Sequence, residues 1–271
     1  MKSVLLHIHE DHGAESRLQA ACDLARASGA HIHCVQVTAV PDFVAADMYG
    51  GASMAPAMMA ELYDIDEKAR TRIEDRLRRE GVSWDWRHVE GDVVHGLLSA
   101  ATLTDGMIVT LPAGPRKEFA DPLHLAADLA LAGRVPVIAV PQEAKSFPVT
   151  GRAVVAWEGS QEASAALRLS VPLLKLAEEV HVVTVEEAGK YPFPATDAPE
   201  YLARHGIKCQ FHTWPQDGRT VEAALKAAIG VLKPDWMVMG AFGHSRLREM
   251  VFGGVTRALL REVHVPLLLA H

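Results

Sequence analysis

The chain contains an internal repeat. A shift of 130 residues sets residues 135–140 (VPVIAV) against residues 265–270 (VPLLLA) without a gap, and residues 107–109 against residues 237–239. Self-similarity over this length indicates two copies of one fold rather than a single irregular domain. A chain of 271 residues is long enough to give each copy a hydrophobic core of its own.

Within each copy, short apolar runs alternate with stretches of helical periodicity. The apolar runs predict strands over 4–8, 32–37, 84–89, 107–111, 135–140, 152–157, 181–185, 208–214, 236–239 and 265–270. The periodic stretches predict helices over 16–28, 64–80, 93–102, 123–132, 162–176 and 220–231, and from 253 onward. This alternation predicts an α/β fold with two tandem, doubly wound, parallel five-stranded sheets related by a pseudo-twofold axis. The first domain is predicted over 1–141, a polar, proline-bearing linker over 142–151 and the second domain over 152–271.

Composition narrows the classes of partner. The net charge is −7 and no tract of Lys and Arg occurs, which argues against a nucleic-acid partner. No apolar run reaches the roughly 20 residues that cross a bilayer, and the first residues lead into a strand rather than a signal peptide. Cys22, Cys34 and Cys209 have neither disulfide-framework nor metal-ligand spacing. We therefore expect a soluble, cytoplasmic protein with no membrane partner.

A glycine-bearing loop follows the strand at 236–239. Gly240 ends that strand, Gly243 comes three residues later, and Gly253 and Gly254 open the next helix. Without a Cβ atom, backbone N–H groups approach an anion closely, and the N-terminus of a helix adds a partial positive charge. The loop therefore predicts a phosphate site, with a simple strand-to-helix crossover as the alternative. A P-loop is absent, and no Rossmann glycine fingerprint follows the first strand of either copy.

The glycine spacing resembles the nucleotide loop of the universal stress protein family, written G-x2-G-x9-G. Both copies look like domains of this family, so the chain is similar to its tandem type. The resemblance implies that ATP, ADP or AMP binds in the second domain, with or without magnesium. The residues it assigns to the base, ribose and phosphates are Ala156, Trp157, Glu158, Val185, Gly240, Gly243, Gly253, Gly254, Val255 and Thr256.

Two residues depart from the family pattern. Gly254 stands where the family has Ser or Thr, which removes one side-chain donor to phosphate. Glu158 stands where the nucleotide-binding branch has Asp, which shifts the carboxylate that would hold the adenine by about one methylene.

The first copy lacks every glycine of the loop. The shift of 130 residues sets Thr110, Ala113, Leu123 and His124 against Gly240, Gly243, Gly253 and Gly254, and Pro112 and Pro115 remove further N–H donors. We therefore predict that the first domain does not bind nucleotide in the same manner.

Several other residues have two interpretations. Imidazoles on two strands expected to be neighbours, from His7, His9 and His12 with His31 and His33, make a metal cluster conceivable. Because no Cys or carboxylate stands at ligand spacing, we favour the alternative of packed or surface histidines and predict no metal site. Alignment of the copies at Ile8 and Trp157 sets His9 against Glu158. Two roles remain for a run of polar residues in the loop, contact with phosphate or a solvated surface: His244, Ser245, Arg246 and Arg248. Four methionines form either a surface that binds a partner or a loop without a role: Met48, Met54, Met58 and Met59.

The resemblance implies a ligand-gated stress-response or signalling module with protein clients that the sequence does not identify. It also implies pairing of residues 135–140 with 265–270, which covers two sheet edges; further association into a homodimer stays open. Glu158 and Ser160 have no His-paired nucleophile beside them, so we predict no enzyme beyond slow, incidental ATP hydrolysis. Two alternatives remain: a scaffold that binds no nucleotide, and a flavin-linked or ATP-hydrolysing enzyme on the same sheet.

Overall fold

The computed structural model of the chain describes residues 1–39, 55–111, 123–186, 195–241, 259–260 and 263–271, with the backbone alone at 55–58 and 123–124. The first half contains β1 (Ser3–Ile8), α1 (Ala14–Ser28), β2 (His31–Thr38), α3 (Ala55–Glu80), β3 (Trp84–Glu90), α4 (Val93–Ala100), the 3-10 helix η1 (Ala101–Leu103), β4 (Gly106–Leu111), α5 (Leu123–Ala132) and β5 (Val137–Pro141). The second half contains β6 (Arg152–Ala156), α6 (Gln161–Leu174), β7 (Glu179–Glu186), α7 (Asp197–Arg204), β8 (Gln210–Pro215), α8 (Val221–Leu232), β9 (Trp236–Gly240) and β10 (Leu267–Ala270).

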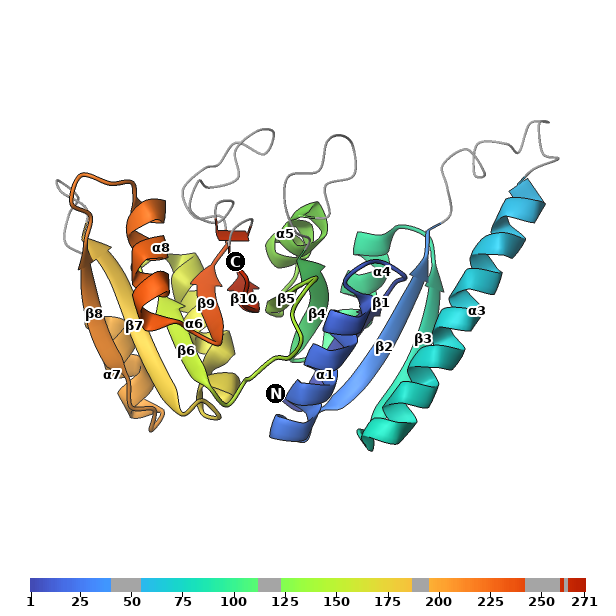
Figure 1. Ribbon diagram of the computed structural model, residues 1–271, viewed down its shortest axis with the longest axis horizontal. Coiled ribbons are helices and arrows are strands. Elements are labelled where there is room, and N and C mark those ends of the chain that lie inside the picture. The colour runs from blue at the N-terminus through green and yellow to red at the C-terminus, as the bar shows by residue number, and fades with distance from the viewer. Residues whose placement is uncertain (40–54, 112–122, 187–194, 242–258, 261–262) are drawn as a thin grey trace.

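These strands form one sheet in the order β3-β2-β1-β4-β5-β10-β9-β6-β7-β8 (Figure 1). The five strands of each half are parallel to one another, as predicted. The halves meet where β5 and β10 pair antiparallel, which confirms the expected pairing of the last strands. The expected two sheets are thus the two arms of one mixed, mostly parallel sheet, because this pairing satisfies the N–H and C=O groups of both inner edges.

The register at the junction has the symmetry of a twofold axis. Leu268 lies opposite Ile138, and these two residues are 130 positions apart in sequence, which is the shift of the internal repeat. The flanking pairs, Leu267 with Ala139 and Leu269 with Val137, exchange with each other under the same shift. A twofold axis that passes between Ile138 and Leu268 therefore relates the two central strands.

The strand pairs away from the junction extend the correspondence. Val4 pairs with Gly106, and Ala153 pairs with Trp236, so Val4 and Ala153 are equivalent. Counting along β1 and β6 from this pair makes Ile8 equivalent to Trp157, and His9 equivalent to Glu158. The alignment inferred from the sequence is confirmed.

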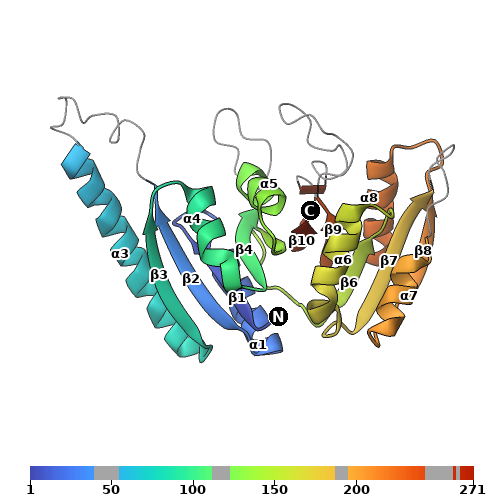
Figure 2. The ribbon, with the colours of Figure 1, turned by 180° about the vertical axis from the view of Figure 1, so that it is seen from behind.

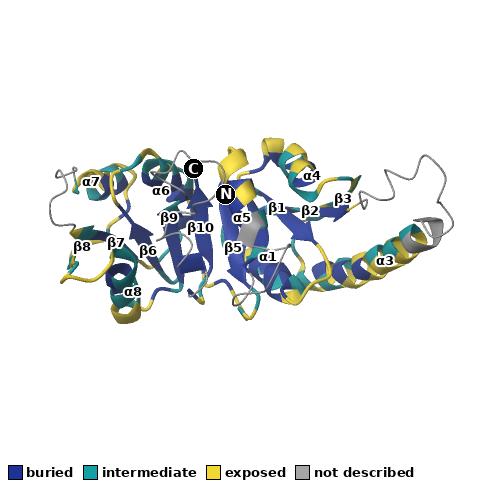
Figure 3. Cartoon of the chain, turned by 90° about the horizontal axis from the view of Figure 1, so that it is seen from above, coloured by how far each residue is buried: buried dark blue, intermediate teal, exposed yellow. Residues whose placement is uncertain are grey.

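Helices cover both faces of the sheet (Figures 1 and 2). One core packs α1, α3, α6 and α7 against the sheet, and the other packs α4, α5 and α8 against the opposite face. Seen from above, the strands are buried along the middle of the molecule, while the outer sides of the helices are exposed (Figure 3). Of the helices that the structure describes, none has both the length and the apolar composition needed to cross a bilayer.

The segment between the halves is packed rather than loose. Phe147 is 2% exposed, and its ring meets the Trp236 ring edge-on at 6.0 Å. Its backbone N–H donates to Asp23 Oδ2 of α1 at 2.9 Å, while Trp236 Nε1 of β9 donates to the Val149 carbonyl at 3.2 Å. Residues 142–151, predicted as a linker, therefore contact both halves.

Two helices differ from the prediction. The helix predicted over 64–80 begins at Ala55, so part of the methionine-rich stretch is helical, in keeping with the high helix propensity of Ala, Met and Leu. α7 lies in a stretch that the prolines made us interpret as a connection. Pro199 falls in its first turn, where the missing N–H costs no helical hydrogen bond.

Candidate functional site

The carboxyl ends of β6, β7 and β9 bring the described candidate residues together. β6 lies between β7 and β9 in the sheet, so Ala156 and the two residues after it stand between Val185 and Gly240. This is the end of a parallel sheet at which ligands bind in open α/β folds. Gly243, Gly253, Gly254, Val255 and Thr256 lie outside the described residues, as do His244, Ser245, Arg246 and Arg248.

Gly240 lets the first turn of α6 approach the sheet. A Cβ atom at this position would lie 2.5 Å from the Ala163 nitrogen and 2.7 Å from the Glu162 carbonyl carbon. Ser160 caps the same turn, because its Oγ accepts from the Ala163 N–H at 3.0 Å. The glycine therefore holds the N-terminus of α6 against the carboxyl end of β9, with the positive end of the helix dipole at the site.

Glu158 is bound to that cap. Ser160 Oγ donates to Glu158 Oε1 at 2.5 Å across the turn at Gly159, whose φ is +75°. Glu158 is exposed, so a ligand has access to its carboxylate. The pair is a hydroxyl donor on a carboxylate, which orients Glu158 as a hydrogen-bond acceptor.

Trp157 is buried and forms part of a pocket. Its side chain is 6% exposed, and its indole Nε1 has no hydrogen-bond partner within the described part of the chain. Its backbone is fixed on both sides, by the Val183 carbonyl at 2.9 Å and the Thr184 hydroxyl at 3.1 Å. An unpaired buried N–H is a donor available to a ligand or to water.

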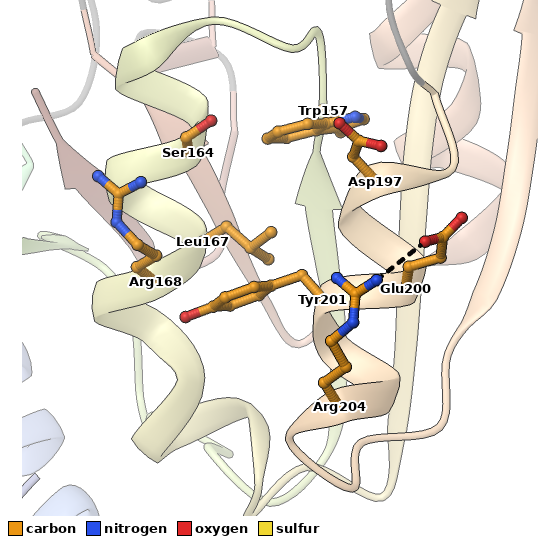
Figure 4. Close-up of a pocket in the computed structure, with 8 residues that line it drawn as sticks. All are labelled: Trp157, Ser164, Leu167, Arg168, Asp197, Glu200, Tyr201 and Arg204. Atoms are coloured by element: carbon orange, nitrogen blue, oxygen red, sulfur yellow. Dashed lines mark hydrogen bonds and ion pairs between the residues drawn. The ribbon is translucent and has the colours of Figure 1, made fainter.

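The pocket lies between α6 and α7 and has a volume of about 320 Å³. Its lining mixes aromatic rings with both signs of charge: Trp157, Ser164, Leu167, Arg168, Asp197, Glu200, Tyr201 and Arg204. Figure 4 shows the Trp157 ring at one end beside Asp197, with Arg168 and Arg204 on opposite walls. Arg204 pairs with Glu200 at 3.2 Å.

Sequence reasoning missed the α7 wall of this pocket. The available signal was amphipathic. Ala198 and Leu202, four residues apart, are both buried, whereas Asp197 and Arg204 are polar, and this pattern indicates a helix.

The first half has different residues at the equivalent positions. Thr110 stands in the place of Gly240, and Gly13, the N-cap residue of α1, makes room for it, since a Cβ atom on Gly13 would lie 2.3 Å from Thr110 Cγ2. Gly13 is equivalent to Glu162 when residues are counted on from β1 and β6. The close approach of helix and strand is thus kept in both halves, with the glycine on opposite partners.

A buried arginine is a further difference between the two halves. Arg17, 2% exposed, donates to the His7 and His9 carbonyls at 2.8 and 2.6 Å, to Asp11 Oδ2 at 2.8 Å and to Thr110 Oγ1. Burial lowers the pKa of its guanidinium, and the Asp11 charge opposes that shift. Its equivalent in the second half is Ala166. We did not single out Arg17 from the sequence, although a charge on the apolar face of a helix was the available signal.

The five histidines do not form one cluster. The His7 and His9 rings stack at 5.8 Å at the carboxyl end of β1, and burial lowers the pKa of His7 well below its usual value. His31 and His33 lie at the amino end of β2, where they meet Asp85 of β3. Met48 and Met54 lie outside the described residues, as does the side chain of Met58, and Met59 is half-buried on α3.

The family model of the universal stress protein family matches residues 150–271. That half of the chain is a universal stress protein domain. The comparisons support a UspA-like protein, and its two halves share one strand order.

A curated sequence relative is also a universal stress protein. The UspA-like chain is 29% identical over 132 residues to the universal stress protein Slr1230 of Synechocystis, a match that covers 46% of this chain and 44% of that protein. The chain thus spans less than half the length of this curated relative.

Two solved structures share the fold over nearly the whole chain. A universal stress protein from Archaeoglobus fulgidus has a TM-score of 0.74 at 17% identity, with 99% of this chain and 97% of that one covered. A putative universal stress protein from Pseudomonas aeruginosa has a TM-score of 0.58 at 15% identity, with 99% and 92% covered. At these identities the likeness establishes the fold.

Proposed function

We propose that this UspA-like protein binds one adenine nucleotide, ATP, ADP or AMP, at the carboxyl end of β6, β7 and β9. The observation that carries the proposal is the contrast between the halves. Arg17 and Thr110 bond to each other between helix and strand end in the first half, whereas Ala166 and Gly240 stand at the equivalent positions in the second. The half without the buried cation is also the half with the glycine spacing.

The described residues supply groups for the base. The carboxylate of Glu158 is an acceptor for the exocyclic amine of adenine, and Val185 supplies an apolar contact at the end of β7. Ser160 already donates to Glu158, so the base must share that carboxylate or displace the hydroxyl. The phosphates, with or without magnesium, are assigned to the glycine loop by its spacing.

The proposed role is a stress-response or signalling module in the cytoplasm. Occupancy of the site would alter the surface that protein clients recognise, by ordering groups at the sheet end. Hydrolysis is expected to be slow and incidental, because Glu158 and Ser160 are bonded to each other and no His-paired nucleophile accompanies them in the described site.

Calorimetric titration with ATP, ADP and AMP, with and without magnesium, tests the proposal. We expect one nucleotide per chain, and a rise in melting temperature, because a ligand at about 100 times its Kd stabilises the native state by about 2.7 kcal/mol. Gly243→Val should abolish binding by obstructing the backbone amides. The matched control is Ala113→Val at the equivalent position of the first half, which should leave binding unchanged.

A stoichiometry of two, or loss of binding in both variants, would contradict the assignment to the second half. No binding of any adenine nucleotide would instead favour a scaffold that acts through protein contacts. Two features support this second candidate. Ser160 is hydrogen-bonded to Glu158, and Gly254 stands where the family pattern has Ser or Thr. An absorption spectrum of the purified protein tests the flavin-linked enzyme, which would be coloured.

A further inference from the structure

Two imidazoles and a carboxylate converge at the amino end of the first half's strands, opposite the end that holds the proposed nucleotide site. His31 and His33 project from the same face of β2, because they are two residues apart on a strand. Asp85 projects from β3, directly opposite His33 in the register. One ligand atom from each of the three side chains lies within 4.8 Å of the other two.

The nitrogens that face the carboxylate are defined. His31 Nε2 lies 3.2 Å from Asp85 Oδ2, and His33 Nδ1 lies 3.0 Å from the same oxygen. In a tetrahedral zinc site with bond lengths of about 2.0 to 2.1 Å, two ligand atoms are about 3.3 Å apart. Both separations from the carboxylate oxygen are close to this value, and the two ring nitrogens lie within 4.8 Å of each other.

The far nitrogen of each ring is held by a serine. His31 Nδ1 lies 2.6 Å from Ser83 Oγ, and His33 Nε2 lies 3.0 Å from Ser3 Oγ. Metal-binding histidines are commonly held in this way, with the second ring nitrogen donating to a polar group that fixes the ring and its tautomer.

The contacts of His33 suit a metal ligand that binds through Nδ1. Its Nε2 lies 3.0 Å from Ser3 Oγ, which also lies 3.3 Å from the Leu103 carbonyl, and its Nδ1 lies 3.0 Å from both carboxylate oxygens of Asp85. In the tautomer with the proton on Nε2, the Nδ1 lone pair is directed at the carboxylate, where an ion would be shared by the two ligands.

We propose that His31, His33 and Asp85 bind a divalent transition-metal ion of the zinc class. Two imidazoles and one carboxylate are ligands that zinc accepts, and three protein ligands leave a fourth position for water or another donor. The side chains are 33%, 34% and 55% exposed, so the ion has a path from solvent.

The second half shows how similar residues form a different arrangement. His181 is equivalent to His33, but its Nδ1 lies 2.9 Å from His212 Nε2 and its Nε2 lies 3.3 Å from Glu179. Its two nitrogens thus face different partners, and Arg152 binds Glu179 at 2.6 Å. That ion pair lowers the pKa of Glu179 and competes with a metal for the carboxylate.

A metal ion here would stabilise the edge strand of the sheet. β3 is the outermost strand of the first half, and the ligands come from β2 and β3, with Ser3 of β1 behind them. A bound ion would therefore link the edge strand to its neighbour by bonds that the parallel ladder alone does not provide.

The experiment titrates the untagged, EDTA-treated full chain with Zn²⁺ by calorimetry, and with Co²⁺ by visible absorption, in the absence of nucleotide. We expect one high-affinity site per chain, with micromolar or tighter Kd, and Co²⁺ bands typical of low coordination number. Asp85→Asn, which keeps the shape of an exposed side chain, should weaken Zn²⁺ at least tenfold, and His33→Ala should abolish the Co²⁺ bands. Ser83→Ala should weaken Zn²⁺ by roughly 10- to 100-fold through loss of ring orientation.

His212→Ala is the matched control, because it removes an imidazole from the equivalent cluster of the second half. It should leave the affinity and the spectrum unchanged. Zn²⁺ should raise the melting temperature of the unsubstituted chain but not that of the Asp85→Asn chain, whose folding is checked by circular dichroism. The proposal would be overturned by absence of Zn²⁺ binding up to 100 times the protein concentration. It would also be overturned if the Asp85→Asn and His33→Ala chains bound Zn²⁺ as tightly as the unsubstituted chain.

Discussion

At the scale of single residues, Arg17 decides what the first half can hold. A guanidinium has five N–H donors, and here they reach backbone carbonyls, a carboxylate and a hydroxyl within one small volume. A charge this deeply buried is tolerated because it is paired and hydrogen-bonded. These contacts engage the guanidinium within the protein, so its donors are not available to a ligand.

Replacement of Arg17 by Met should destabilise the protein by about 3 to 5 kcal/mol, because it leaves two carbonyls and the Asp11 carboxylate without their partner. Urea unfolding followed by circular dichroism measures the change. Arg72→Ala is the control: that side chain is 58% exposed and pairs with Glu10, so the cost should stay below about 1 kcal/mol. Equal costs for the two substitutions would show that Arg17 is not a structural cation.

The candidate site illustrates which residues a sequence can identify. Glu158, Val185 and Gly240 were assigned by the family resemblance, and their places at strand ends agree with it, since strand ends are set by local apolar patterns. Arg17 and Asp85 were not identified, because their importance comes from partners 93 and 52 residues away, Thr110 and His33 respectively. The apolar helix face around Arg17 indicates burial, but no local pattern encodes the distant partner of either residue.

At the scale of elements, helix and strand approach each other through one glycine per half. The central strands were predicted well because each is a short apolar run, whereas the edge strands β3 and β8 alternate apolar and polar residues. α7 was missed because its prolines suggested a loop, and the packing of residues 142–151 was missed because one buried ring, Phe147, outweighs a polar composition.

Gly240→Ala should cost about 1 to 3 kcal/mol, because the new methyl would lie 2.5 Å from a backbone nitrogen that cannot move without shifting α6. Gly230→Ala on α8 is the matched control. A Cβ atom there meets nothing within 4 Å, so the change should stabilise the helix by about 0.5 to 1 kcal/mol. Denaturant unfolding of both variants measures these opposite signs, and a neutral Gly240→Ala would mean that β9 and α6 have room to separate.

At the scale of the whole molecule, the two halves share one sheet and a packed connection. Ile138 and Leu268 at the junction are buried, and Phe147 binds α1 of one half and β9 of the other. Separation of the halves would expose apolar side chains and two unpaired strand edges together. We therefore expect the chain to unfold in one cooperative transition.

The distribution of tryptophans gives a direct test. The chain has 5 tryptophans, of which Trp84 and Trp86 lie in the first half, so replacing both by Phe leaves fluorescence that reports on the second half alone. Circular dichroism of the same variant reports on both halves. Coincident midpoints in urea are expected, whereas fluorescence and circular dichroism midpoints that differ would mean that the halves unfold independently.

The axis between Ile138 and Leu268 has a consequence for how this molecule can vary. In a symmetric pair of identical chains, any substitution on one side is copied to the other. Here the two sides are encoded separately, so Thr110 and Gly240, or Asp85 and Gln210, differ although they occupy matching places. One polypeptide thus keeps the architecture of a dimer while its two lobes are free to specialise.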